Sequence, residues 1–277
     1  NPNVYGVLLV GLGCEQILLA DVKQAIATTG KPVEGILIQE EGGSPEAEAR
    51  GIEIVRKLQE EAERQSRVPC SAGGLVVGVQ CGGSDWTTAV AGNTVIGAMA
   101  DHVIENGGSV LMSEVMGFPG SEQIVAANAV SREVALQILD MVTDLRAEYV
   151  ELYGQTIEEV NPTPGNKKGG LANIVEKALG SIAKSGSSAI VEVLRPGEKP
   201  TQKGLIFAAT PASDFVCGTE QLASGIHLQV FTTGRGTPYG LAMAPVIKVA
   251  SHSELAAQWS DLIDVNAGTI ATGEATI

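Results

Sequence analysis

The sequence predicts an α/β protein whose parallel sheet is covered by helices on both faces. Short apolar runs rich in β-branched residues recur along the chain, and several end at glycine, as buried parallel strands do. Longer amphipathic segments with helical spacing lie between these runs. Since strand–helix alternation requires crossover connections, we expect a three-layer parallel sheet of Rossmann or flavodoxin type in the first half.

Regularity differs between the two halves of the chain, and this difference predicts two domains. Residues 1–150 alternate strand and helix patterns regularly, and they are predicted to form the parallel α/β domain. Residues 151–277 are less regular. They are predicted to form a second α/β domain that carries basic and glycine-rich loops for the substrate.

Local signals delimit the elements of the first half. Gly30 and Pro32 end one helix, and Ser44 followed by Pro45 begins the next, because proline is favoured in the first helical turn. The predicted strands are 4–10, 33–39, 74–79 and 109–115, and the predicted helices are 20–29, 44–64, 93–106 and 121–149.

In the second half, a loop rich in proline, glycine and asparagine at 161–170 precedes a predicted helix at 171–184. Strands are expected wherever short apolar runs follow turn residues. They are predicted at 189–194, 205–209, 228–232 and 245–250, and a helix is predicted to begin at Ser253.

Composition and charge disfavour several classes of protein. The 277 residues carry 18 basic and 32 acidic side chains, and the net charge of −14 repels the phosphate backbone of nucleic acids. We therefore expect no nucleic-acid partner. No apolar run approaches the ~20 residues of a membrane span, so we expect no membrane partner either. The four cysteines are too scattered for a disulfide framework, which predicts a cytoplasmic protein. The chain begins with Asn1 and not with Met, and we interpret it as a fragment or a processed chain.

Two glycine-rich loops follow predicted strands, where ligands bind in open α/β sheets. The loop 11–15 begins like a dinucleotide-binding turn, but Gln16 stands where the third glycine is needed; a tight turn with a buried cysteine is the alternative. The loop 81–85 could present backbone N–H groups to an anion. If both strands belong to one sheet, Cys14 and Cys81 would converge as metal ligands. Alternatively, both are small buried hydrophobic residues.

Two further segments carry charge suited to an anionic substrate. Residues 161–203 contain seven basic and three acidic side chains, and a solvated basic surface is the alternative interpretation. In the segment 232–240, Arg235 lies between two glycines, where a guanidinium could clamp a carboxylate through two N–H donors. The chain lacks the motifs of serine hydrolases, P-loop NTPases and zinc proteases. The histidines, His102, His227 and His252, are interpreted as bystanders and not as ligands.

Five segments together resemble the altronate/galactarate dehydratase family. The resemblance extends over essentially the whole chain, and the stretches 165–188, 208–217 and 264–277 are most similar to the galactarate branch of the family. The five segments are Gly-Leu-Gly-Cys-Glu at 11–15, Cys-Gly-Gly-Ser-Asp at 81–85, Pro-Gly-Asn-Lys-Lys-Gly-Gly at 164–170, Glu-Lys-Ala-Leu-Gly at 176–180 and Thr-Thr-Gly-Arg-Gly-Thr-Pro-Tyr-Gly at 232–240.

The resemblance implies a hydro-lyase that removes water from a galactarate-like sugar diacid and yields a 3-deoxy-2-keto acid. The alternatives are an altronate dehydratase, the large subunit of a sulfolactate sulfo-lyase, and, for a fragment, a non-catalytic anion-binding module. Members of the family depend on a divalent metal, usually iron(II). Cys14 and Cys81 would then bind iron with a third ligand from a segment that this chain lacks, and the chain alone would show little activity.

Such a dehydration needs a base for the weakly acidic proton α to a carboxylate, and a metal or cation for the ene-diolate that forms. Because no histidine is well placed, a lysine whose pKa is lowered by nearby cations is the best base. The partners that we expect are the sugar acid and further copies of the chain in a homo-oligomer. The predicted catalytic residues are Lys167, Lys177 and Glu176, and the predicted substrate-binding residues are Arg235, Thr233, Thr237, Ser84, Asp85, Asn166 and Lys168.

Overall fold

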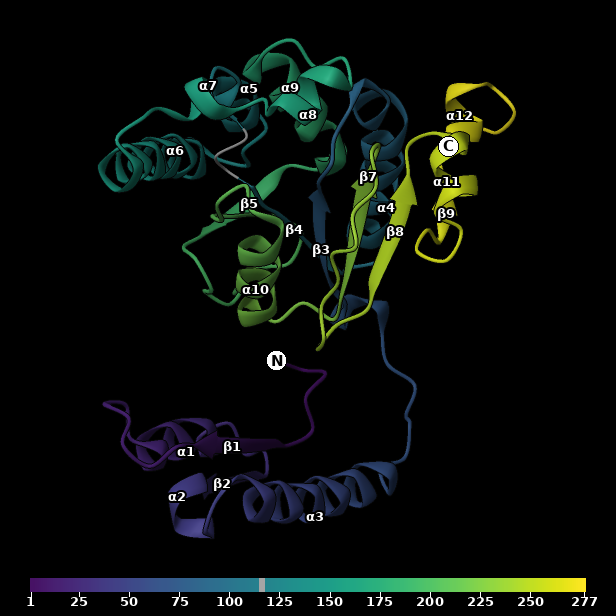
Figure 1. Ribbon diagram of the computed structural model, residues 1–277. Helices are drawn as coiled ribbons and strands as arrows, with labels where there is room; N and C mark the ends of the chain where they lie inside the picture. The colour runs from purple at the N-terminus through teal and green to yellow at the C-terminus, as the bar shows by residue number, and fades with distance from the viewer. Residues whose placement is uncertain (115–117) are drawn as a thin grey trace. The chain divides into compact units, whose positions relative to one another are not determined.

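The chain folds as two compact units (Figure 1). The computed structural model describes residues 1–114 and 118–277. The N-terminal unit is Pro2–Cys70, and the C-terminal unit is Ser71–Ile277 together with Asn1. The fold therefore divides near residue 70 and not near residue 150.

Strands from both sides of residue 150 pair in one sheet, so the predicted boundary there does not divide the fold. Val110 in β4 (Ser109–Met112) pairs with Leu205 in β6 (Leu205–Ala208). A parallel sheet is stable only when neighbouring strands share their backbone hydrogen bonds, so β4 and β6 must belong to the same domain. The change in regularity near residue 150 reflects longer connections within one sheet.

A single parallel sheet forms the centre of the C-terminal unit. Seven strands among the described residues lie in the order β5-β6-β4-β3-β7-β8-β9, and every neighbouring pair is parallel. The predicted α/β class with a parallel sheet is confirmed. The further strands are β3 (Val76–Cys81), β5 (Ile190–Leu194), β7 (Leu228–Thr233), β8 (Val246–Ala250) and β9 (Val265–Asn266).

Alternate side chains of the sheet fill two cores, which makes the unit three-layered. Val110 and Met112 pack with residues of α4 (Asn93–Glu105) and α6 (Arg132–Tyr153), whereas Leu111 packs with α10 (Asp214–Ser224) on the opposite face. The period of two along a strand produces this division. None of the described helices is both long and apolar enough to cross a membrane. The smaller helices are α5 (Glu122–Ala127), α7 (Ile157–Val160), α8 (Pro164–Lys168), α9 (Ile174–Ile182), α11 (Ser253–Gln258) and α12 (Gly268–Ala271).

The N-terminal unit has its own small sheet. Its two strands pair only with each other among the described residues, so they do not join β3 and β4 as the prediction of one sheet in the first half required. Its core is Ile36, Ala47 and Ile54, with Leu8 packed against them. The elements are β1 (Val7–Gly11), α1 (Leu19–Ala27), β2 (Val33–Leu37), α2 (Ile38–Glu41) and α3 (Ser44–Glu63).

One predicted helix is two helices in the structure. The pattern at 121–149 continues without a break, but α5 ends at Ala127 and α6 begins at Arg132. The Ser131 side chain caps α6 by accepting the backbone N–H of Val134, and Ala129 forms a β-bridge with Ile190. The predicted strand 109–115 ends at Met112 in β4, and its last residue lies outside the described residues.

Replacing Gly97 by Ala is expected to destabilise the C-terminal unit by about 1–3 kcal/mol, because overpacking costs that amount in a rigid core. An added Cβ at this position in α4 would collide with the Ala183 carbonyl oxygen, which is backbone and cannot turn away. The melting temperature is measured by calorimetry, with Gly74→Ala as a control, since Gly74 has open space around it. Equal melting temperatures of the two variants would contradict the close helix packing.

Candidate functional site

A polar cavity of about 210 Å³ lies in the C-terminal unit, where β3, β4 and β7 reach their carboxyl ends. Ligands bind at this edge of open α/β sheets. Its volume is below the roughly 300–1,000 Å³ of sites for drug-sized ligands, which suits a smaller molecule. The walls are formed by Cys81, Gly82, Gly83, Ser84, Glu114, Thr163, Gly165, Asn166, Lys177, Ser181, Ala212, Asp214 and Arg235.

Three of the four loops singled out in the sequence meet at this cavity. The loop after β3 contributes Cys81 and Ser84, the loop around α8 contributes Asn166, and the loop after β7 contributes Arg235. Lys177 reaches the same space from α9. Parallel strands end at one edge of the sheet, so segments far apart in the sequence are brought together here.

The Lys177 amine is held by two amide oxygens. Its Nζ donates to Asn161 Oδ1 at 2.8 Å and to Asn166 Oδ1 at 3.1 Å. Burial lowers the pKa of Lys177, the neighbouring Lys184 ammonium lowers that pKa as well, and nearby negative groups act against both. A lysine with a lowered pKa can act as a general base near neutral pH.

Asn166 fastens the loop around α8 to the loop after β3. Its Nδ2 donates to the Ser84 carbonyl oxygen at 2.9 Å, and its Oδ1 accepts the Thr163 N–H at 3.1 Å as well as the Lys177 amine. The side chain is buried. Asn166 thus lines the cavity as predicted, but most of its hydrogen-bonding capacity serves the architecture of the site.

A buried ion pair lies beneath the cavity. Lys184 has no exposed surface, its ammonium donates to the Glu114 carboxylate, and it also donates to Cys81 Sγ at 3.2 Å. The second hydrogen bond to that carboxylate comes from the Cys81 N–H at 3.0 Å. Burial alone would lower the pKa of Lys184, but the charges of Cys81 and Glu114 raise it above its ordinary value.

No sequence motif points to this ion pair. Lys184 was counted only in the basic segment, although it follows Lys177 by two helical turns and therefore shares its face. Glu114 lies two residues after β4 and inside the predicted strand 109–115, so an acidic residue in a buried strand was the available signal. Its backbone is left-handed, with φ of 69°, which is rare for a residue with a side chain.

Asp214 completes the titratable groups of the cavity. It is the first residue of α10, and its Oδ1 accepts a hydrogen bond of 3.4 Å from Gln80 Nε2. Burial, and secondarily the charge of Glu114, raises the pKa of Asp214 to about 6. The Asp214 carboxyl can therefore change its charge close to neutral pH.

Arg235 is the exposed cation at the cavity, and its loop is built by buried threonines. Thr233 Oγ1 accepts the Gly236 N–H at 2.9 Å. The Thr237 carbonyl accepts the Lys248 amine at 2.7 Å. Thr233 and Thr237 were predicted to bind substrate, but they shape the loop from below and do not line the cavity.

Four other predicted residues lie outside the cavity walls. Lys167 and Lys168 are exposed on α8. Glu176 is exposed, and its carboxylate accepts the Ala172 N–H at 2.7 Å. Asp85 is buried, and its Oδ1 accepts the Thr87 hydroxyl at 2.6 Å. A local hydrogen-bonding role thus accounts for both acidic residues.

The predicted metal ligands do not follow strands of one sheet. Cys14 is exposed after β1 in the N-terminal unit, whereas Cys81 is buried at the end of β3. Within 1–114 and 118–277, no group of three or more His, Cys, Asp or Glu side chains could hold a metal ion. The Lys184 ammonium already binds the Cys81 sulfur and the Glu114 carboxylate, which are the atoms that a metal ion would need as ligands. The described residues of the cavity therefore do not form a metal site by themselves, and iron(II) remains a prediction for the full-length protein.

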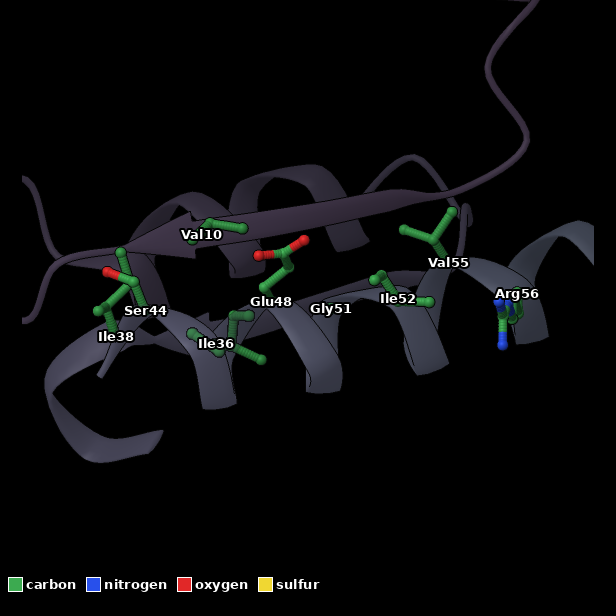
Figure 2. Close-up of a pocket in the computed structure, with 10 residues that line it drawn as sticks. Val10, Ile36, Ile38, Ser44, Glu48, Gly51, Ile52, Val55 and Arg56 are labelled. Carbon is green, nitrogen blue, oxygen red and sulfur yellow. The ribbon is translucent and has the colours of Figure 1, made fainter. Parts of the chain in front are cut away.

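A larger cavity of about 540 Å³ lies within the N-terminal unit (Figure 2). Apolar side chains such as Val10, Ile36 and Ile52 form most of its walls, and Glu48 and Arg56 contribute charge. It contains none of the predicted site residues. Since a catalytic site needs several converging polar groups, the smaller polar cavity is the stronger candidate.

Comparison with known families gives the same division of the chain as the structure. Residues 72–277 match the family model described as D-galactarate/Altronate dehydratase, C-terminal, and residues 1–63 match D-galactarate dehydratase/Altronate hydrolase, second domain. The chain belongs to the D-galactarate/altronate dehydratase family. This confirms the resemblance read from the five sequence segments.

The relatives that the chain matches are longer than the chain. It is 49% identical to the galactarate dehydratase (L-threo-forming) of Escherichia coli K12 over 284 residues, which cover 100% of the chain and 54% of that relative. It is 36% identical to the altronate dehydratase of the same organism, covering 99% of the chain and 54% of the relative. It is 33% identical to the (2R)-sulfolactate sulfo-lyase subunit beta of Chromohalobacter salexigens, covering 96% and 68%. The chain thus spans about half the length of the two dehydratases.

Replacing Lys184 by Met is expected to destabilise this family member by about 3–5 kcal/mol, because it leaves the Glu114 carboxylate buried without its partner. Urea unfolding of the chain measures the change. Lys168→Met is the matched control, since Lys168 is exposed and makes no buried pair. A free energy of unfolding that is equal in the two variants would show that the ion pair does not stabilise the fold.

Proposed function

We propose that the full-length protein is a hydro-lyase that dehydrates a galactarate-like sugar diacid to a 3-deoxy-2-keto acid. The observation that carries the proposal is the cavity itself, where Arg235, Lys177 and Asp214 line one small space. These groups supply an anion-binding cation, an amine with a lowered pKa and a carboxyl with a raised pKa. Relatives named as galactarate and altronate dehydratases support this reaction class.

Each group has a role in this proposal. Arg235 binds a substrate carboxylate through parallel N–H donors. Lys177 removes the proton α to the carboxylate, and Asp214 donates a proton to the departing hydroxyl. The Lys177 ammonium that forms stabilises the negative charge of the ene-diolate.

A substrate panel tests the reaction class. Purified full-length protein is assayed anaerobically, with and without iron(II), against galactarate, altronate and sulfolactate, and formation of a 2-keto acid or sulfite is followed. We expect galactarate to give the highest kcat/KM. Sulfite release would favour the sulfo-lyase, and tight galactarate binding without turnover would favour an anion-binding module.

The pH profile of kcat/KM reports the two proton-transfer groups. We expect activity to rise up to about pH 6, to stay level, and to fall above the pKa of Lys177. Below pH 6 both groups are protonated, so the base is blocked; above the pKa of Lys177 neither group is protonated, so the acid is missing. In Asp214→Asn, which should lose turnover, the rate at which the α-proton exchanges with solvent should rise with pH up to the pKa of Lys177.

Exchange of the α-proton with deuterated water separates the base from the acid. Lys177→Met should lose this exchange, whereas Asp214→Asn should keep it while losing turnover, because exchange needs only the base. Lys199→Met serves as the control, since Lys199 is exposed and outside the cavity. The reverse pattern would exchange the roles of Lys177 and Asp214.

Arg235→Lys in the full-length protein is expected to lose roughly 2–3 kcal/mol of binding, or about 30- to 150-fold in kcat/KM, because lysine keeps the charge but not the paired donors. The melting temperature should stay close to that of the wild type, since Arg235 is exposed. Arg195→Lys, at an exposed arginine away from the cavity, is the control. Normal kcat/KM with a lowered melting temperature would make Arg235 a structural residue instead.

The proposed setting is the cytoplasm, with the protein as a homo-oligomer. The four cysteines, Cys14, Cys70, Cys81 and Cys217, are free thiols, which is typical of a reducing compartment. Light scattering on the purified full-length protein measures the oligomeric state.

A further inference from the structure

Arg235 lies in a loop that is held on one side by the loop after β3. The Gly83 carbonyl oxygen accepts hydrogen bonds from the Gly234 N–H at 3.2 Å and from the Arg235 N–H at 2.9 Å. These bonds fix the backbone from which the guanidinium extends. They leave the other side of the loop to be held by a different element.

That element is the segment around α11, and His252 makes the contact. His252 precedes α11, and its Nδ1 accepts the Leu255 N–H at 3.2 Å. A neutral imidazole whose Nδ1 accepts carries its proton on Nε2. The Nε2–H therefore donates to the Gly234 carbonyl oxygen, 2.7 Å away. His252 does not line the cavity, so it reaches the site only through this loop.

Little space remains for the loop to take another path. A Cβ at Gly234 would collide with the Asp85 carboxylate, and one at Gly236 would lie 2.9 Å from the Trp259 ring. The Asp85 Oδ2 also lies 3.8 Å from His252 Nε2. The two glycines that flank Arg235 are thus enclosed by the Asp85 and Trp259 side chains. Among these contacts, His252 adds a directed hydrogen bond to the Gly234 carbonyl oxygen.

We infer that His252 is a positioning residue that fastens the Gly234 carbonyl and so directs Arg235 toward the substrate carboxylate. This inference rests on the proposed function, which gives Arg235 its role. A carboxylate clamp acts equally on the bound substrate and the transition state, so a misplaced Arg235 raises KM and leaves kcat unchanged. A residue that only stabilised α11 would lower the melting temperature without changing KM.

The two ring nitrogens can be tested separately. Asparagine places an acceptor where Nδ1 lies, so His252→Asn keeps the helix cap but loses the bond to Gly234. Glutamine reaches as far as Nε2, so His252→Gln can restore the donor to Gly234 but caps the helix poorly. The pair therefore distinguishes positioning of Arg235 from stabilisation of α11.

Steady-state kinetics with galactarate and thermal melting are measured on the full-length protein and on these variants. We expect His252→Asn to raise KM about three- to tenfold, the effect of one lost hydrogen bond, with kcat and melting temperature near those of the wild type. His252→Gln should recover most of the wild-type KM and melt at a lower temperature. In an Arg235→Ala background, His252→Asn should have no further effect on KM, because the two residues act as one unit.

His102→Asn, on the exposed face of α4, is the control for histidine replacement. An unchanged KM in His252→Asn, or an additive effect with Arg235→Ala, would overturn the inference while the proposed function stands. Absence of both turnover and galactarate binding in the wild type, by kinetics and calorimetry, would overturn the proposed function and the inference with it.

Discussion

The buried ammonium of Lys184 is the interaction on which the rest of the site depends. It joins Cys81, at the end of β3, and Glu114, two residues after β4, to the turn that follows α9. A lysine without exposed surface is stable only when negative or accepting groups surround it, because removing a charge from water costs several kcal/mol. The ends of β3 and β4 must therefore stay beside α9, and the cavity forms between them.

The same ion pair acts on the two titratable groups above it, in opposite directions. Burial is the main cause of both shifts, but the Lys184 charge also lowers the pKa of Lys177, and the Glu114 charge also raises the pKa of Asp214. The two pKa values are thereby brought closer to neutral pH than those of an exposed amine and carboxyl. Charges that contribute to the fold thus also shift the pKa values of the proposed base, Lys177, and the proposed acid, Asp214.

The sequence predicted the fold class and most of the elements, because strand runs and helix caps are local signals. It misplaced the domain boundary, because no local signal says that β4 pairs with β6, a partner that lies some ninety residues away in the chain. The loops around Cys81, Asn166 and Arg235 were found from glycine and charge. Lys184, Glu114 and Asp214 were missed as site residues because only tertiary packing shows that they are buried together. Asp85, Thr233 and Thr237 were predicted to bind substrate, but they lie outside the cavity walls and make local hydrogen bonds, because polar residues beside a site often hold its loops.

A protein of net charge −14 is proposed to bind a dianion, so its acidic surface must not repel the substrate from the cavity. Surface charges beyond the Debye length of about 8 Å at physiological ionic strength are largely screened, so distant acidic residues have little effect at the cavity. Arg235 is exposed at the cavity, and Lys177 lies within it. Lys167 and Lys168 are exposed on α8, next to the wall residue Asn166. Local cations are therefore expected to govern the proposed anion binding at this site, and the acidic remainder of the surface can serve solubility without opposing it.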